Sequence, residues 1–331
     1  MAFTNTFDTT NQGSAVSNRE DLTDVLTILA PEETPILSSA NKERATATNV
    51  EWTVDSLSAP VTSGISEGAD VTAFTDKFAG RARLSNRVQK FRRDYMVSDL
   101  QEAVDSVGPA KIAQAEAKAI RELKRDIEAT LSGTQDSSIE NVAGVANALR
   151  GLGDWIDSAG PSDVPSDFRT PAASIVDVTD DVFAESELNG LISSIFKVTG
   201  TSENLMLIAD TALRTDISDF ARIGGVSGDS VRTVNYSGES GSIKLSVDLY
   251  QSDHGVVSVV NANPDCAPTQ AGQAGMQGYL VNPEYYGVHE LIPMGSTRLP
   301  NLGGGERGFV DCALTLGVYH PGAHGKITAT S

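Results

Sequence analysis

The most regular pattern of apolar and polar positions lies between Pro109 and Gly133. Apolar side chains recur there at steps of three and four, which predicts one buried helical stripe: Ile112, Ala115, Ala119, Leu123, Ile127 and Leu131. The polar side chains between them predict a face turned to water: Lys118, Glu122, Lys124 and Glu128. Pro109 suits a first helical turn, and Gly133 suits the C-terminal end. We therefore expect a rod about 35 Å long.

Residues 46–96 have a period of two instead, which predicts strands. Val50, Trp52 and Val54 share one face of the outgoing strand. In the return strand, one face carries Ala82, Leu84, Asn86 and Val88 and the other carries Arg81, Arg83, Ser85 and Arg87. The tip between the strands is rich in Gly, Ser and Thr, and we expect few of its side chains to pack. A two-stranded ribbon is marginal in water, so we expect it to lie on a neighbouring subunit.

The other segments alternate between helical and strand patterns. We expect an extended arm over residues 1–18 and a short helix from residue 19 with its stripe at Leu22, Val25, Leu26 and Leu29. Residues 134–180 are rich in loops. A later helix carries Leu188, Leu191, Ile192, Ile195 and Phe196 on one face, and Asp210 is placed to cap another. Strands are expected over 205–209, 231–236, 242–250, 255–260, 278–282, 285–292 and 309–320, the last burying Val310, Cys312, Leu314, Leu316 and Val318.

Composition and charge exclude several classes of protein. The chain has 331 residues, 40% of them hydrophobic, which is too many for a disordered protein. A net charge of −19 opposes binding to nucleic acid or to anionic membranes over the whole surface, and no apolar run is long enough to span a bilayer. Cys266 and Cys312 form no C-x-x-C motif and predict no disulfide scaffold.

One stretch of this acidic chain is basic: Arg81, Arg83, Arg87, Lys90, Arg92 and Arg93. A solvated strand face is the ordinary explanation of such a run. The alternative is a contact stripe that meets the acidic surface of a second copy, where opposite charges set the register of the contact. Nucleic-acid binding ranks third, because only Phe91 and Tyr95 supply aromatic rings nearby.

A search for catalytic or metal-binding motifs finds none with its required context. G-I-S-E-G at residues 64–68 matches the nucleophile motif of hydrolases, but it lies in the ribbon tip with no helix after it. His320 and His324 have the spacing of zinc ligands, yet Pro321 and Gly322 stand between them. The glycine runs lack the residues of a phosphate-binding loop. We therefore expect no catalytic residue, cofactor or metal.

Six short motifs occur in order along the chain: N-R-E-D-L at 18–22, A-P-E-E-T-P at 30–35, E-W-T-V-D-S-L at 51–57, D-H-G-V-V at 253–257, N-P-E-Y at 282–285 and A-H-G-K-I at 323–327. Together with the order of elements they resemble the major capsid proteins of tailed phages, whose fold is named after the Hong Kong phage and is shared with encapsulins. The middle of the chain, 134–180, carries no matching motif.

The resemblance implies an α+β fold with five parts: an N-terminal arm (1–45), an E-loop β-hairpin (46–96), a P-domain with a spine helix (97–180), an A-domain (181–280) and C-terminal strands returning to both domains (281–331). It implies no enzymatic activity and a homo-oligomer of hexamers and pentamers that closes an icosahedral shell. Double-stranded DNA is then packaged without sequence-specific binding, and no membrane is involved. On this basis we expect intersubunit contacts at Trp52, Arg83, Arg87, Lys90, Arg92 and Arg93.

The same resemblance leaves partners and alternatives open. A portal, a decoration (cement) protein and a separate scaffold are possible partners, and the expected location is the virion, after synthesis in the host cytoplasm. Lys77 is the only candidate for a covalent crosslink near the ribbon tip. The alternatives are an encapsulin-like compartment and, from a different class, an α/β hydrolase that uses a serine and one of the four histidines.

Overall fold

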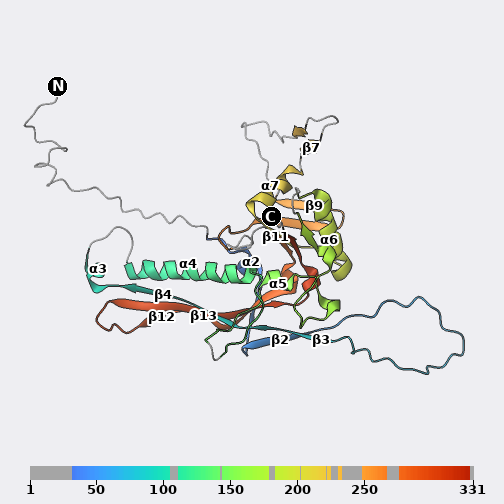
Figure 1. Ribbon diagram of the computed structural model, residues 1–331, viewed down its shortest axis with the longest axis horizontal. Helices are drawn as coiled ribbons and strands as arrows, with labels where there is room; N and C mark the ends of the chain where they lie inside the picture. Colours follow the sequence, from blue (N-terminus) through green and yellow to red (C-terminus); the bar gives the residue numbers. More distant parts are fainter. Residues whose placement is uncertain are drawn as a thin grey trace, which may run out of the picture.

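The computed structural model describes residues 32–104, 111–141, 144–178, 183–201, 203–220, 222–224, 230–232, 248–266 and 276–328. It consists of an elongated part, a compact α/β part and a ribbon that ends in a long loop (Figure 1). The helix expected from residue 19, Pro109, and most of the strands expected over 231–236 and 242–250 lie outside the described residues.

A four-stranded sheet and one long helix form the elongated part (Figure 1). The strand order is β1 (Asn41–Arg44), β12 (Tyr286–Leu299), β13 (Glu306–Val318) and β4 (Gln89–Val97). β1 is parallel to β12, and the other two pairs are antiparallel. The helix α4 (Lys111–Ser132) lies along β4 and β13, and the short α3 (Asp99–Ala103) precedes it at the distal end.

The helix α4 has the length and the apolar stripe that the sequence predicts. Ala119, Leu123, Ile127 and Leu131 are buried, while Ile112 and Ala115 pack against the same cluster. One prediction was wrong: Glu128, expected to face water, is fully buried. Helical periodicity places Glu128 away from the sheet, but a second segment covers that side of the helix. This segment contains α2 (Pro35–Ser39).

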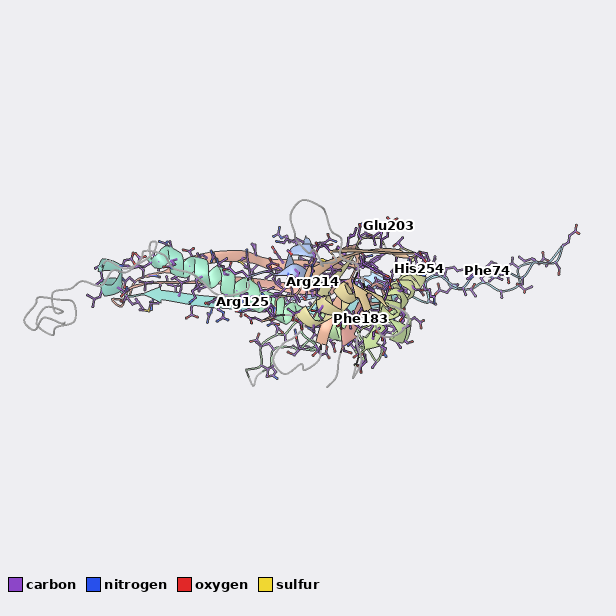
Figure 2. The ribbon with its side chains drawn as sticks, turned by 90° about the horizontal axis from the view of Figure 1, so that it is seen from above. Phe74, Arg125, Phe183, Glu203, Arg214 and His254 are labelled. Atoms are coloured by element: carbon purple, nitrogen blue, oxygen red, sulfur yellow. The ribbon has the colours of Figure 1, made fainter. Side chains whose placement is uncertain are left out.

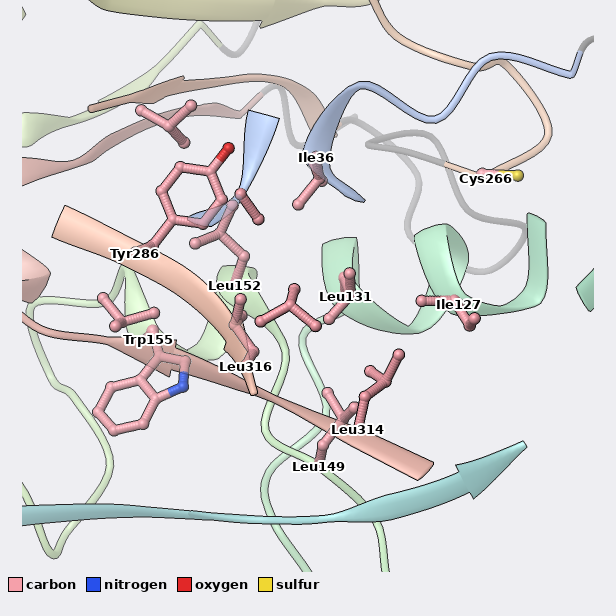
Figure 3. Packing of buried hydrophobic residues seen from close by; sticks show 14 of the residues in the cluster. Ile36, Ile127, Leu131, Leu149, Leu152, Trp155, Cys266, Tyr286, Leu314 and Leu316 are labelled. Atoms are coloured by element: carbon pink, nitrogen blue, oxygen red, sulfur yellow. The ribbon is translucent and has the colours of Figure 1, made fainter. Parts of the chain in front are cut away.

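The main core joins the helix to both sheets. Leu314 and Leu316 of β13 lie in the same buried cluster as Ile127 and Leu131 of α4 (Figure 3). Val318 belongs to this cluster too. The five side chains of β13 expected in the core, Cys312 included, are buried. Burial alternates only as far as Cys312, because from there to Val318 both faces of the strand are covered. Two short elements of the loop-rich region also contribute to this core, namely α5 (Leu152–Trp155) and η1 (Ser166–Phe168). A third, η2 (Ala172–Ser174), contacts the helix α6 (Glu185–Thr199).

The compact part is a six-stranded sheet. Its order is β5 (Ile175–Asp177), β14 (Gly325–Thr328), β11 (Met276–Val281), β6 (Leu205–Ala209), β10 (Gly255–Asn261) and β9 (Leu249–Ser252). β5 and β14 come from outside the segment 181–280. One face packs against α6 (Glu185–Thr199) and α7 (Thr211–Asp219), and the other packs against the main core. Smaller elements are β7 (Arg222–Gly224), β8 (Ser230–Arg232), η3 (Pro283–Tyr285) and η4 (Pro321–Ala323).

The stripe of α6 is confirmed except at one position. Leu188, Leu191, Ile192 and Ile195 are fully buried, but Phe196 is 44% exposed and stacks on His254. The helix ends where expected, because Gly200 adopts a left-handed conformation with φ of 73°.

The predicted ribbon is shorter than residues 46–96. Only β2 (Asn49–Val54) and β3 (Ala82–Arg87) pair with each other, whereas β4 leaves the ribbon and joins the four-stranded sheet beside β13. Val88 and Phe91 are both buried, although strict alternation would place them on opposite faces of one strand. They belong to different clusters of buried residues. The return strand is therefore two strands in different sheets.

One buried amide fixes the base of the ribbon. Asn86 of β3 accepts a hydrogen bond from the Arg150 backbone N–H at 2.8 Å and donates to the carbonyl oxygens of Arg150, at 3.1 Å, and Leu316, at 2.6 Å. The Arg150 guanidinium, almost fully buried, in turn pairs with Asp136, Asp154 and Asp163. The base of the ribbon thus packs on its own subunit, and the expected contact of the ribbon with a neighbouring subunit stays a prediction.

Replacing Asn86 by Ala should lower the free energy of unfolding of the unassembled subunit by roughly 1–3 kcal/mol, because three backbone groups lose a buried partner. Denaturant unfolding of the free subunit measures this. Asn49→Ala is the matched control, since Asn49 is only half-buried and its amide bonds to the exposed side chain of Glu51. Equal losses in the two variants would mean that Asn86 does not hold the ribbon.

Candidate assembly surface

Trp52, the aromatic candidate for an intersubunit contact, packs on its own chain. Its ring centroid lies 5.7 Å from that of Trp155 and 6.1 Å from that of Tyr319. Trp52 and Val54 border the main core, and Leu84 on the paired strand is fully part of it. The indole of Trp52 therefore stabilises the ribbon base, and an intersubunit role for this residue stays a prediction.

The five basic candidates for an intersubunit contact do not form one stripe. Arg83 lies on the ribbon and bonds to Glu51 on the paired strand at 3.1 Å. Lys90, in β4, lies 3.0 Å from Asp311 on β13. Arg93 donates to both carboxylate oxygens of Asp126 on α4. Each of these three charges has a partner within its own subunit.

Alternation along β4 places its bases on opposite faces of the sheet. Arg93 shares the α4 face with the buried Phe91, so Lys90 and Arg92 point to the other face. Among the described residues, the guanidinium groups of Arg87 and Arg92 make no ion pair. Arg87 is half-buried and Arg92 is exposed. Of the five basic candidates, these two have side chains that remain free for a contact with another copy of the chain.

In the loop of residues 55–81, which we call the assembly loop, every residue is exposed. The loop contains six large apolar side chains that are 61–100% exposed: Leu57, Val61, Ile65, Val71, Phe74 and Phe78. Figure 2 shows Phe74 on the part of the loop that extends far from the body of the protein. Monomeric soluble proteins rarely expose so much apolar surface together, and such surfaces mark interaction sites.

Sequence reasoning missed these side chains, because the many Gly, Ser and Thr residues around them suggested a tip with little to pack. Leu57, Val61 and Ile65 stand four residues apart, and Val71, Phe74 and Phe78 stand three and four apart, which is a helical spacing. Pro60 and the glycines among them disfavour a helix, so this spacing selects no element. The available signal was simpler: six large apolar residues within a segment otherwise typical of a solvated loop.

The base of the assembly loop is held by a charged cluster. Arg81 donates to Asp55 at 2.8 Å, and its guanidinium carbon lies 4.1 Å from the centre of the Phe78 ring. This closes the loop where the two strands of the ribbon meet it. Beyond that point the loop carries Glu67, Asp70, Asp76 and Lys77, all exposed. Its surface is therefore apolar with an acidic excess.

The hydrolase motif lies in the same loop. Ser66, between Gly64 and Gly68, is exposed, and neither a strand nor a helix adjoins it. A nucleophile elbow needs a strand before the serine and a helix after it. The structure therefore lacks the setting in which this motif works.

The two histidines with zinc-like spacing are packing residues. His324 is fully buried, its Nδ1 accepts a hydrogen bond from the Asn282 backbone N–H, and burial lowers its pKa to about 3. His320 packs edge-on against Tyr285, and burial lowers its pKa as well. Among the described residues, no group of three or more His, Cys, Asp or Glu side chains is placed to hold a metal ion. No described helix is long and apolar enough to cross a membrane.

Comparisons with known proteins point to one kind of protein. The family model for the SU10 major capsid protein matches residues 3–331. The capsid structure of the cyanophage P-SCSP1u is 13% identical and has a TM-score of 0.62, with both chains fully covered. The Mycobacterium phage Bobi structure is 10% identical with a TM-score of 0.62, over 97% of this chain and 99% of the other.

A third structure, the capsid of a native GTA particle, is 10% identical with a TM-score of 0.63, over 98% of this chain and 99% of the other. At these identities, the likeness concerns the fold alone. No curated protein matches the sequence significantly.

Amide hydrogen exchange should divide the ribbon into two parts in the free subunit. Residues 49–54 and 82–87 should exchange slowly, because they are paired and anchored, while residues 56–80 should exchange at nearly the rate of an unfolded chain. After assembly only the second set should gain protection. Uniform protection of residues 49–87 in the free subunit would contradict the division.

Proposed function

This chain belongs to the SU10 major capsid protein family, and we propose that its subunits bind one another mainly through the assembly loop. It is a major capsid protein of tailed phages, a component of the virion and a subunit of a homo-oligomeric capsid. The family match does not favour the encapsulin-like or hydrolase alternatives. What remains to be proposed is how the subunits meet.

The exposed apolar side chains of the assembly loop carry this proposal. Burying one of them on a neighbour contributes about 1.5–3 kcal/mol. Ordering the loop costs about 1–2 kcal/mol for each residue that becomes fixed. A single contact therefore roughly offsets the ordering of one or two residues, and stable attachment needs several contacts at once. Assembly by this route is cooperative.

The unpaired Arg87 and Arg92 supply a second, weaker contribution. The subunit has a net charge of −19, so any approaching copy presents mostly carboxylates. Two free guanidinium groups favour the orientations in which they meet that surface. We retain both as contact residues, and keep Arg83, Lys90 and Arg93 as candidates whose present partners lie in their own subunit.

We further propose the complete arrangement that the resemblance implies. Hexamers and pentamers close an icosahedral shell around double-stranded DNA. A portal, a decoration protein and a separate scaffold protein are its candidate partners. The subunit carries no catalytic activity and is made in the host cytoplasm. The arm, E-loop, P-domain and A-domain divide the chain near the boundaries given above, except that the E-loop ends with β3, because β4 belongs to the four-stranded sheet. The assembly loop forms the tip of the E-loop.

Electron microscopy of the expressed chain, alone and together with the other proteins of its virion, tests the shell. Closed particles of uniform size support it. A chain that stays monomeric with all of these partners present contradicts it. Nucleic-acid content of the particles separates a genome shell from a compartment that holds protein.

The variant Phe74→Asp should assemble poorly while the subunit stays folded. Losing about 1.5–3 kcal/mol per contact raises the critical concentration for assembly roughly 10- to 100-fold. Light scattering against subunit concentration measures it. Thr75→Asp adds the same charge one residue away and should have a much smaller effect. Equal effects would assign the loss to charge alone and contradict the apolar contact.

Changing Arg87 and Arg92 together to Glu should slow assembly and leave the circular dichroism of the free subunit unchanged. The reason is that two attractive contacts become repulsive toward an acidic neighbour. A control with Lys124→Glu and Lys197→Glu changes the net charge by the same amount at other exposed positions. If the control slows assembly as much, these two positions have no special role.

A further inference from the structure

The segment of residues 32–45, which we call the arm root, is bound to the body of the subunit at several points. Glu32 pairs with Arg121 of α4 at 3.0 Å, and the Glu33 carbonyl oxygen accepts a hydrogen bond from Asn263 at 2.9 Å. Ile36 is fully buried in the main core. Further along, β1 pairs with β12. The arm root therefore connects the N-terminal part of the chain to α4 and to the sheet.

Glu128 of α4 lies at the centre of this attachment. Its two carboxylate oxygens accept hydrogen bonds from the backbone N–H groups of Ile36, at 2.8 Å, and Leu37, at 2.9 Å. These are the first free N–H groups of α2, where the residue before the helix, Thr34, provides no side-chain cap. Glu128 makes no ion pair with a cation among the described residues.

The surroundings of Glu128 contain few groups that compensate a charge. Arg125, on the same helix, bonds to Asp265. Tyr286 of β12 faces Glu128 and hydrogen-bonds to Ser39. Cys266 is a further titratable neighbour of Glu128, and the Arg125 guanidinium interacts with this thiol. Burial raises the pKa values of this tyrosine and this thiol, so both stay neutral at physiological pH.

We propose that Glu128 makes the attachment of the arm root depend on protonation: α2 docks on α4 most firmly when the buried carboxyl is neutral, and loosens when it is ionised. An ionised carboxylate without a cation is costly in this core, despite its two hydrogen bonds. When α2 moves away, water reaches the carboxylate and removes that cost. The arm root and the protonation of one side chain are thereby coupled.

The direction of the coupling follows from the pKa of Glu128. Burial raises it to about 7, against an opposing effect of the two N–H bonds, while an exposed glutamate has its ordinary value near 4.5. Between these values the docked state holds a proton that the undocked state lacks. Docking is therefore strongest at low pH, weakens as the pH rises through this window, and is weakest above about pH 7.

Hydrogen exchange at the amides of Ile36 and Leu37 tests this in the full-length free subunit. With pKa values of about 7 and 4.5, the docking equilibrium is about tenfold more favourable at pH 6 than at pH 8. The ratio of intrinsic to observed exchange rate should change by the same factor. Equal ratios at the two pH values, or a higher ratio at pH 8, overturn the proposal without any variant.

Two variants assign the effect to Glu128. Glu128→Gln should abolish the tenfold change, with amide protection of β13 showing that the variant is folded. Glu122→Gln, a partly exposed acid earlier on α4, should retain it. His289, which faces Glu43 of β1 and whose pKa burial lowers, accounts for any small change left in Glu128→Gln. A full tenfold change in Glu128→Gln assigns the effect elsewhere and overturns the proposal.

Discussion

The side chain of Asn86 joins three segments that are far apart in the sequence, and the position of the assembly loop depends on it. Through this amide β3 is fixed to Arg150 and to Leu316. Since β3 carries one end of the loop and pairs with the strand that carries the other, the ribbon base sets where the loop leaves the body. An amide suits this task, because it can donate and accept at once in a core where each unpaired backbone group is costly.

The apolar side chains of the ribbon and of its loop fall into a buried set and an exposed set. Leu84, Trp52 and Val54 are used within the subunit, and the loop side chains from Leu57 to Phe78 are exposed. The subunit thus folds without burying the apolar side chains that we propose for the contact between subunits. If the base of the ribbon became ordered only on contact with a neighbour, the direction of the loop would be undefined in the free subunit. Each intersubunit contact would then have to order both the ribbon base and the loop.

The sequence predicted the elements with long regular patterns and failed where a distant segment changed the surroundings. The stripes of α4 and β13 follow from local spacing, because one face of each meets a continuous core. Glu128 was misassigned since the segment that buries it lies about ninety residues earlier. The division of the return strand at Val88 was equally hidden, because alternation cannot tell which strand becomes the partner. For the candidate site, the sequence found the basic residues, but not that three already have carboxylate partners.

Charge determines how the contributions to assembly are shared. Subunits with a net charge of −19 repel one another at a distance, so the encounter itself is unfavourable. Ion pairs from two free arginines are weak in water and screened by salt, and cannot supply the missing affinity. Burial of apolar surface does not depend on the sign of the charge and acts only at contact. On the assembly route that we propose, the loop therefore supplies most of the affinity, the arginines favour one orientation, and the acidic surface keeps subunits apart until several contacts form together.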